Sequence, residues 1–383
     1  RLLMTAPTFD RGFTTPEMAT VFSAERTVAV ILEFEAALAG ALADAGVAPM
    51  EAAAAIAAAC LEPFGQPETL LASAWESGTA LIAIKAEIER RLDAEWRVWV
   101  HRGATSQDAV DTGRMLQARD GLAQLEGSAV AVARHLRGLV DRHRHQPQMA
   151  RTFLQDARPT TFGARAAGWL APTLGHINEL RRVRGTLPVQ LGGPSGDSSS
   201  YGPAAAEVIG ALARRLGLTA PPVAWHTDRS PIWGLARTVE AMALTATKIS
   251  TDVALLAQSS VGEVTVRPGG SSSMAEKRNP IDAIRAVAAA SACSGFASML
   301  VMAPVNQLDR GVGGWHTEWL ALPMLFHTGA AAVASVATLL ESLEVDTERM
   351  SRVIEESGLE ASTPDNRLID GVLARFDQVV GPG

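Results

Sequence analysis

The stretch AVAAASACSGFASMLVMAPVNQL, residues 286–308, runs for 23 positions without a charged side chain. A second stretch, WLALPMLFHTGAAAVASVATLL at residues 319–340, does so for 22 positions. Each is long enough to cross a membrane, but serine, threonine, proline and amide side chains interrupt both. We therefore expect soluble helices that are apolar on every side and must be covered on every side. Other subunits supply such cover most easily, so the sequence predicts an oligomer and no membrane span.

The rest of the 383-residue chain has a composition typical of packed helices. Hydrophobic residues make up 47% and charged residues 20%, alanine is plentiful, and there is one tyrosine. This balance favours helices over β-sheet. Apolar periodicity and Gly/Pro/Ser-rich connections predict helices at residues 27–48, 50–60, 108–144, 161–185, 204–216, 231–260, 280–305 and 317–343. We expect an all-α protein, an elongated helical bundle preceded by a small helical unit in the first hundred residues.

Charge and cysteine content exclude several classes of protein. A net charge of −7, from 34 basic and 41 acidic side chains, argues against nucleic-acid binding. Cys60 and Cys293 lie far apart in alanine-rich segments, so neither a disulfide framework nor metal-ligand spacing is visible. The first residues lack an apolar core of signal-peptide length. We expect a cytoplasmic protein without a metal or other cofactor.

Polar side chains are concentrated in three segments, which we call the first, second and third polar regions in chain order. The third polar region is GGSSSMAEKRNP, residues 269–280. Its adjacent glycines make the backbone easy to reshape. Lys277 and Asn279 offer donors for a carboxylate, and the serines at 271–273 offer oxygens that could take up a proton. One interpretation is an ordinary flexible Gly/Ser loop. The other is a mobile loop that meets an anionic substrate.

The first polar region is HRGATSQDAVDT, residues 101–112. Thr105 or Ser106 would cap the helix that begins there. The exposed N–H groups at the start of that helix could hold a carboxylate. The simpler interpretation is an N-cap without any ligand.

The second polar region is RTFLQDARPTTFG, residues 151–163. Gln155 and Asp156 lie there between apolar residues, shortly before Pro159. One interpretation is a polar cluster that carries chemistry. The alternative is a loop that enters a helix.

Taken together, the three regions resemble, in order and separation, the signature regions of the fumarase/aspartase superfamily. The third of those signatures has the pattern G-S-S-x-M-P-x-K-x-N-P. Within the superfamily the likeness is closest to the bacterial 3-carboxy-cis,cis-muconate cycloisomerases, a lactonising branch. It extends from about residue 9 to residue 350. The segments that carry it are GATSQDAVDT (103–112), LGGPSG (191–196), WHTDR (225–229), GEV (262–264), KRNP (277–280) and WHTEW (315–319).

The resemblance implies a fold and an assembly. It implies a three-part chain, with an N-terminal helical domain at residues 1–100, a central long-helix bundle at 101–343 and a shortened C-terminal helical unit at 344–383. It also implies a homotetramer whose central helices form one large bundle. Each active site would then combine the three polar regions from three different subunits.

The resemblance also implies the chemistry. A proton is added or removed next to a carboxylate, and a C–O or C–N bond at the β-carbon is made or broken through an enolate-like dianion. Ser272 falls on the catalytic base, and Lys277 and Asp156 fall on other catalytic positions. Lys277 and Asn279 would hold the substrate carboxylate as its charge grows. Further carboxylate-binding candidates are His101, Thr105, Ser106, Gln155 and Arg285, the last with a salt bridge inside the bundle as its alternative.

Three positions depart from the pattern. Asp156 stands where lactonising relatives usually carry histidine, so it could be a general acid or only a hydrogen-bond acceptor. In the third polar region Ala275 and Glu276 replace the usual proline and histidine. A carboxylate at Glu276 would repel an anionic substrate unless it points away.

We therefore expect a cofactor-free enzyme that acts on a small polycarboxylate and binds neither nucleic acid nor membranes. Its expected reaction converts 3-carboxy-cis,cis-muconate to a carboxymuconolactone in aromatic-acid catabolism. One alternative is a lyase of the same superfamily that eliminates an amine, nitrite or nucleotide group from a succinyl compound. Ala86 disfavours adenylosuccinate lyase, because those enzymes place a histidine there. The other alternative is a structural homologue without activity, which would not need Ser272, Lys277 and Asn279.

Overall fold

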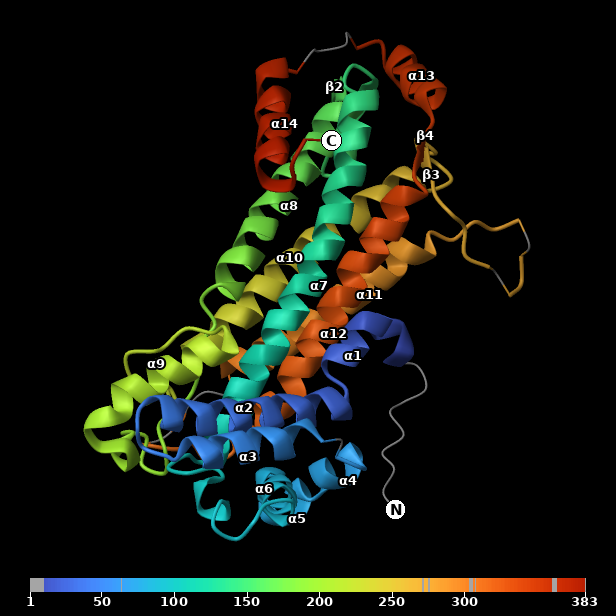
Figure 1. Ribbon diagram of the computed structural model, residues 1–383. Helices are drawn as coiled ribbons and strands as arrows, with labels where there is room; N and C mark the ends of the chain where they lie inside the picture. Colours follow the sequence, from blue (N-terminus) through green and yellow to red (C-terminus); the bar gives the residue numbers. More distant parts are fainter. Residues whose placement is uncertain are drawn as a thin grey trace.

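Long helices run side by side along the molecule and form its central bundle in the computed structural model (Figure 1). The structure describes residues 10–62, 64–270, 272–274, 276–302, 306, 308–359 and 364–382. The bundle helices are α7 (Ser106–Arg142), α8 (Phe162–Arg184), α10 (Ser230–Leu256), α11 (Ile281–Met302) and α12 (Gly314–Glu341). Their apolar faces share one large core. The predicted all-α, elongated bundle is therefore confirmed.

The two uncharged stretches form α11 and α12, which pack against each other and against α10. By length and composition alone, both could cross a membrane, a test that core helices of soluble proteins also pass. Within this single chain 67% of the apolar window of α12 is buried, but only 33% of that of α11. Ile284 and Met302 of α11 are 52% and 79% exposed. An apolar face of α11 thus remains uncovered in one chain.

Short helices of the N-terminal part lie across one end of the bundle (Figure 1). They are η1 (Asp10–Phe13), α1 (Pro16–Val21), α2 (Ala24–Asp44), α3 (Met50–Leu61), α4 (Pro67–Ala72), α5 (Ala74–Ser77), α6 (Leu81–Arg90) and η2 (Arg97–Trp99). The elements from α2 onward share a second core with α9 (Ala205–Leu216), which follows η3 (Ser199–Ala204), and with the start of α7, whereas η1 and α1 pack against the core of the bundle. The second core fixes the end of α7 at which the first polar region lies.

The other end of the bundle carries the few strands. An antiparallel hairpin joins β1 (Pro147–Thr152) to β2 (Gln155–Thr161), with Pro147 opposite Thr161 and Thr152 opposite Gln155. The short strands β3 (Val264–Thr265) and β4 (Glu344–Val345) also pair there. The helices α13 (Thr347–Ser357) and α14 (Asn366–Val380) complete this end. The sequence of residues 151–163 had indicated either a site or a loop that enters a helix, so these strands were not predicted.

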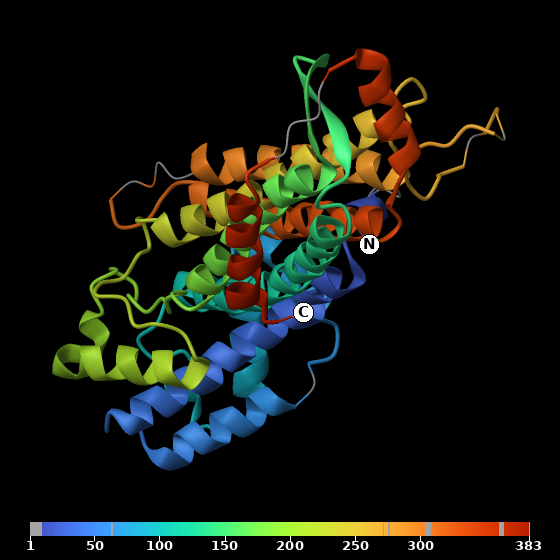
Figure 2. The same cartoon turned by 90° about the horizontal axis from the view of Figure 1, so that it is seen from above.

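The described residues between β3 and α11 project away from the bundle in two perpendicular views (Figures 1 and 2). These residues belong to the third polar region. Their base is closed by a backbone hydrogen bond of 2.8 Å from the N–H of Gly269 to the carbonyl oxygen of Asn279. The third polar region is therefore a closed loop that reaches outward from its own chain.

Candidate active site

The first polar region lies where the N-terminal helices meet the bundle. Thr105 is the N-cap residue of α7, and Ser106 is the first residue of the helix. The N–H of Thr105 donates to Oδ2 of Asp108 at 2.9 Å. Arg310, from the connection between α11 and α12, donates to Oγ1 of Thr105 at 3.0 Å. The start of α7 thus presents two hydroxyls next to a cation that the sequence analysis did not single out.

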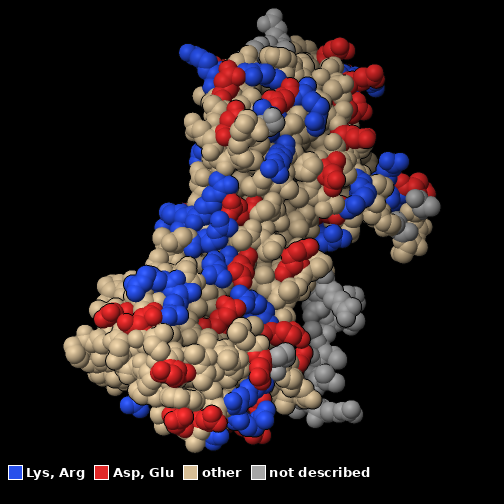
Figure 3. All heavy atoms as spheres, in the orientation of Figure 1, with Lys and Arg blue, Asp and Glu red and all other residues tan. Residues whose placement is uncertain are grey.

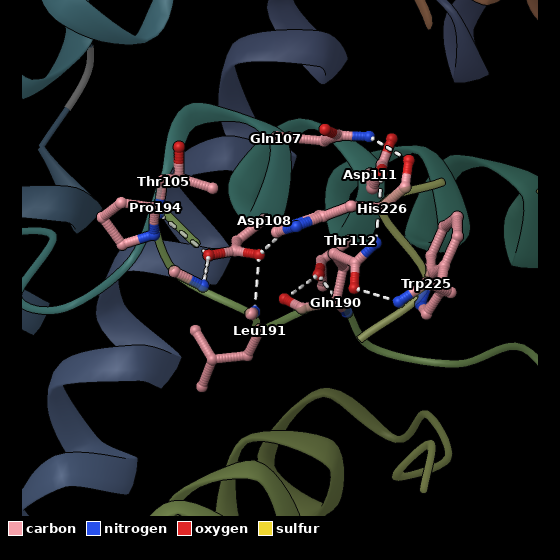
Figure 4. Close-up of polar contacts among 12 residues, drawn as sticks. Thr105, Gln107, Asp108, Asp111, Thr112, Gln190, Leu191, Pro194, Trp225 and His226 are labelled. Carbon is pink, nitrogen blue, oxygen red and sulfur yellow. Dashed lines mark hydrogen bonds and ion pairs between the residues drawn. The ribbon is translucent and has the colours of Figure 1, made fainter. Parts of the chain in front are cut away.

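Asp108 ties three separate segments together (Figure 4). Besides Thr105, its carboxylate accepts from the N–H groups of Gly192 and Gly193 at 2.8 and 2.9 Å and contacts Nε2 of His226 at 2.7 Å. The Asp108 side chain is fully buried. Buried carboxylates need such a complete set of donors. The LGGPSG and WHTDR segments are therefore held against the first polar region by one carboxylate.

Two glycines permit these segments to approach so closely. Gly103 has φ +75°, and a Cβ there would lie 2.6 Å from the ring of Tyr201. Gly193 has φ +70°, and its Cβ would lie 2.7 Å from the carbonyl oxygen of Gly103. Residues with a side chain rarely adopt such φ values, and there is no room for a Cβ at either position. Any other residue would push the loops apart and move Thr105.

A second set of buried hydrogen bonds supports the same segments (Figure 4). Oγ1 of Thr112 both accepts from the N–H of Gln190 at 2.9 Å and donates to its carbonyl at 3.1 Å. The side chain of Gln190 in turn accepts from the N–H of Trp225 at 2.9 Å. Gln107 donates to the carbonyl of His226 at 2.9 Å. Polar side chains that face inward from α7 therefore organise loops instead of facing the substrate.

A buried ion network joins α7, α10 and α12. The guanidinium of Arg229 donates to both oxygens of Asp111, at 2.7 and 3.0 Å, and to Glu318 at 2.9 Å. Trp315 donates to Asp111 at 2.9 Å. Burial opposes the charge on Arg229, but the two carboxylates outweigh it and raise the pKa of Arg229. Burial also raises the pKa of Glu318, against the effect of Arg229.

This network holds a guanidinium and not a metal ion. Among the residues that the structure describes, no group of three or more His, Cys, Asp or Glu side chains is placed to bind a metal. Arg229, Asp111 and Glu318 were not predicted from the sequence as members of a site. Each is a charged residue in a segment that is otherwise buried. Since charged groups are buried only when they are paired, this could have indicated a buried ion network.

His101 lies beside the N-cap and contacts a buried carboxylate. Its Nδ1 is 2.7 Å from Oε1 of Glu35 on α2, whose side chain is 0% exposed. Burial favours the neutral ring, but the charge and hydrogen bond of Glu35, with the charge of Asp108, outweigh burial and raise the pKa of His101. Because Nδ1 is engaged, Nε2 is the ring nitrogen left for a substrate. Glu35 therefore promotes the charged form of a candidate substrate-binding group.

The second polar region lies at the opposite end of the bundle. Gln155 is exposed after the turn of the hairpin, and Asp156 is 56% exposed with an ion pair of 3.1 Å to Nε of Arg151. Arg151 also binds Oε1 of the buried Glu263 at 2.6 Å, and Gln148 binds its Oε2 at 2.8 Å. Glu263 belongs to the GEV segment and thus anchors the hairpin. Asp156 is an ion-pair partner in the single chain and remains open to solvent.

The projecting loop carries the remaining candidates. Ser272, Glu276 and Lys277 are exposed, and Nδ2 of Asn279 donates to the carbonyl of Gly270 at 3.3 Å. Ser271 and Ala275 lie outside the described residues. At the start of α11, Arg285 lies 3.3 Å from Oδ1 of Asp282, the salt bridge expected as its alternative role. The backbone N–H of Lys277 donates to the carbonyl of Met274 at 3.3 Å, but among the described residues no side-chain hydrogen bond or ion pair commits Ser272 or Lys277 to a structural task.

One chain does not bring all the predicted site residues together. His101, Thr105 and Ser106 lie at one end of α7, whereas Gln155 and Asp156 follow its other end (Figure 1). A helix of 37 residues spans about 55 Å at 1.5 Å per residue. The third polar region projects from the bundle, away from the first. The candidate active site is therefore divided between distant parts of the chain.

Comparison with known proteins places this arrangement among lyases. A family model described as a lyase matches residues 11–292. The chain is 40% identical over 353 residues to the 3-carboxy-cis,cis-muconate cycloisomerase of Pseudomonas aeruginosa, covering 90% of this chain and 77% of that protein. It is 33% identical to the nitrosuccinate lyase of Streptomyces davaonensis, covering 86% of this chain and 73% of that protein.

The fold agrees with the same group of proteins. The solved structure of the 3-carboxy-cis,cis-muconate lactonizing enzyme from Pseudomonas putida is similar with a TM-score of 0.84 and 33% sequence identity. The match covers 97% of this chain and 87% of that chain. The likeness therefore extends over nearly the whole chain.

Proposed function

The chain belongs to the lyase family whose model matches most of its length, and we propose that it is a cycloisomerase that converts 3-carboxy-cis,cis-muconate to a carboxymuconolactone. The observation that carries the proposal is the 40% identity to an enzyme of that name. That match covers 90% of this chain and 77% of that enzyme.

The chemistry assigns a task to each loop residue. A carboxylate oxygen of the substrate bonds to the β-carbon of a conjugated acid, and the electron pair of that C=C bond moves to the α-carbon and its carboxylate. Lys277 and Asn279 hold this growing charge. The hydroxyl of Ser272 gives its proton to the α-carbon and is reprotonated by water, and in the reverse reaction its alkoxide is the base that removes the proton. The reaction involves no net oxidation and needs no cofactor.

We further propose a homotetramer in which three subunits contribute to each site. Within one chain the first and second polar regions are separated by the length of α7, and the third projects outward. Large apolar side chains are exposed on the bundle helices, namely Leu244, Ile284, Met299, Val301, Met302 and Leu320. Packing of these faces between copies would cover them and bring regions from different chains together.

The substrate is a small polycarboxylate, and the expected location is the cytoplasm. On the face that Figure 3 shows, basic side chains gather at the left of the molecule's middle, with acidic side chains beside and between them. The net charge of −7 supports a local anion site, with no general affinity for nucleic acid. Cys60 and Cys293 are buried and free, which suits a reducing compartment.

The test follows loss of the conjugated diene of 3-carboxy-cis,cis-muconate by ultraviolet absorbance. We expect turnover by the wild-type chain and a loss of about 10²–10⁴-fold in Ser272→Ala, because the proton-transfer group is removed. Ser273→Ala changes the neighbouring exposed serine and should retain most of the rate. Equal rates for Ser272→Ala and wild type would remove Ser272 from proton transfer.

A second candidate is elimination from a succinyl compound to give fumarate. The likeness to nitrosuccinate lyase favours it, as does Glu276, an exposed carboxylate in a loop that should otherwise meet a highly anionic substrate. Absence of diene loss, together with fumarate release from nitrosuccinate, would establish this candidate. Absence of both reactions in a folded oligomer would instead support a scaffold without activity.

A further inference from the structure

A cavity of about 340 Å³ lies between the N-terminal helices and the bundle, bordered by α2, α5, α7 and α12. Its walls are mostly apolar, formed chiefly by Phe22, Val30, Ile31, Leu71, Trp319 and Pro323. None of the residues proposed above for catalysis or substrate binding lines it. Its volume falls in the range of small-molecule sites, and such sites combine apolar walls with a few polar groups.

Arg114 supplies the charged group of this cavity. Its guanidinium donates to Oε1 of Gln117 at 2.9 Å and makes a long contact of 3.5 Å to the carbonyl of Trp319. The carboxylates of Asp111 and Glu318 form their ion pairs with Arg229. Burial lowers the pKa of Arg114 to about 10, although the charges of these carboxylates act to raise it, and neither carboxylate is hydrogen-bonded to it. Arg114 is a half-buried guanidinium that, among the described residues, has an amide but no carboxylate at hydrogen-bonding distance, and burying such a charge without a counter-ion is costly.

The other polar groups near Arg114 leave its charge without a counter-ion. The acceptor oxygen of Gln117 already serves Arg114, and its amide donates to the carbonyl of Val21 and to Oγ1 of Thr27. The indole Nε1 of Trp319 is buried and does not reach the surface of the cavity. The described wall therefore offers the cavity a positive charge, with the Gln117 acceptor already engaged.

We propose that this cavity is a second binding site, for a small carboxylate with an apolar body about the size of one aromatic ring. The carboxylate pairs with Arg114, and the ring packs against Phe22 and Pro323. A charge-assisted pair of this kind is among the stronger polar contacts in proteins. The site goes beyond the proposed reaction. Its occupant would connect the N-terminal helices to the bundle.

The competing role for Arg114 is balance of the charges on Asp111 and Glu318. That role needs a cation near the ion network but no ligand in the cavity. The two accounts differ in whether the cavity binds a carboxylate. They also differ in which residues of the cavity wall are needed. Only the binding account gives importance to the volume beside Ala74, a partly buried residue of α5 that lines the cavity without touching the network.

The first test is calorimetric titration of the full chain with benzoate, benzyl alcohol and acetate. We expect benzoate to bind at least tenfold more tightly than benzyl alcohol, which lacks the charge, and than acetate, which lacks the ring. Arg114→Met should weaken benzoate binding by about 10–100-fold, the equivalent of one strong charge-assisted contact. Arg134→Met makes the same change at an exposed position of α7 and should leave binding unchanged.

A second variant keeps the test decisive if Arg114→Met does not fold. Ala74→Leu should fill the cavity and abolish benzoate binding, whereas Ala72→Leu, at the exposed end of α4, should not. Absence of benzoate binding to the wild-type chain would overturn the proposal. Binding that persists in Ala74→Leu but is lost in Lys277→Ala would also overturn it, because the ligand would then occupy the proposed catalytic site.

Discussion

At the scale of single residues, Asp108 organises the first polar region. Its carboxylate receives backbone N–H groups of Thr105, Gly192 and Gly193 and also contacts His226. Asp108→Asn replaces one of the two acceptor oxygens with an NH₂ group, which would be placed against some of these donors. We expect the free energy of unfolding to fall by about 2–5 kcal/mol, because buried donors lose their acceptor. Urea unfolding monitored by circular dichroism measures this change.

The matched control for this prediction lies on the same helix. Asp141, near the C-terminal end of α7, is 46% exposed, and its only ion pair in the described chain is a long one of 3.7 Å to Arg137. Asp141→Asn should change the free energy of unfolding by about 0.5 kcal/mol or less. A similar loss for both variants would show that Asp108 has no special structural role.

His101 and Glu35 predict a specific dependence of stability on pH. Since Glu35 raises the pKa of His101 in the folded protein, its stabilising effect is fully present below the pKa of an unfolded histidine. It is lost as the pH rises through the folded pKa. In Glu35→Gln the pKa of His101 should fall, because burial then dominates. The stability difference between wild type and variant should thus be largest at acid pH.

Two measurements check this prediction. The pH dependence of the thermal unfolding midpoint gives the stability difference, and NMR of ¹³C-labelled histidine rings gives the direction of the change in the pKa of His101. Lys85→Gln removes a more distant charge that lowers the pKa of His101, so it should raise that pKa. A stability difference that is independent of pH would contradict the assigned role of Glu35.

At the scale of elements, helices followed from the sequence more readily than strands. The uncharged stretches and the long periodic segments became α7 to α12 with ends within a few residues of those expected. Helical hydrogen bonds are local, so composition and spacing largely determine them. The hairpin at 147–161 escaped prediction, because each strand finds its hydrogen-bond partners only on the other.

The turn of this hairpin leads to a further prediction. Phe153 and Leu154 have φ of 52° and 63° and are 99% and 69% exposed. Bulky residues disfavour this conformation, whereas Asn-Gly suits it. The combined variant Phe153→Asn, Leu154→Gly should raise the stability of the chain by about 1 kcal/mol. It should also lower kcat/KM, if the exposed apolar pair contacts another subunit near a shared site.

Thermal unfolding and the diene assay measure the two effects separately. Val223→Asn alters another apolar side chain, 73% exposed, and should leave both quantities nearly unchanged. A more stable variant with full activity would show that Phe153 and Leu154 have no role in activity. A less stable variant would show that the turn conformation is favourable for these residues after all.

At the scale of the whole molecule, assembly is the central prediction. Ile284 on α11 and Leu244 on α10 are each 52% exposed. Glutamate at both positions should prevent burial between copies, since an uncompensated charge in an apolar interface is strongly unfavourable. Light scattering should show four chains for wild type and fewer for the double variant, which should also lose diene turnover.

Two controls separate assembly from other effects. Leu61→Glu changes an apolar residue of α3 that is 86% exposed and should leave the mass unchanged. Separately, inactive Ser272→Ala and inactive Thr105→Ala chains, unfolded together and refolded as a mixture, should regain part of the activity, because some sites combine intact regions from different chains. A fully active monomer would contradict the shared site.

Composition, periodicity and short motifs were enough to predict the helical class, the elongated bundle and the lyase family, because they are local properties that the chain carries in any conformation. The pairs of groups that meet could be learned from the folded chain alone. Glu35 reaches His101, Asp108 reaches His226, and Arg229 joins Asp111 to Glu318, each across a long separation in sequence. Such contacts depend on how the helices pack, which no local pattern encodes. The same packing separates the polar regions within one chain.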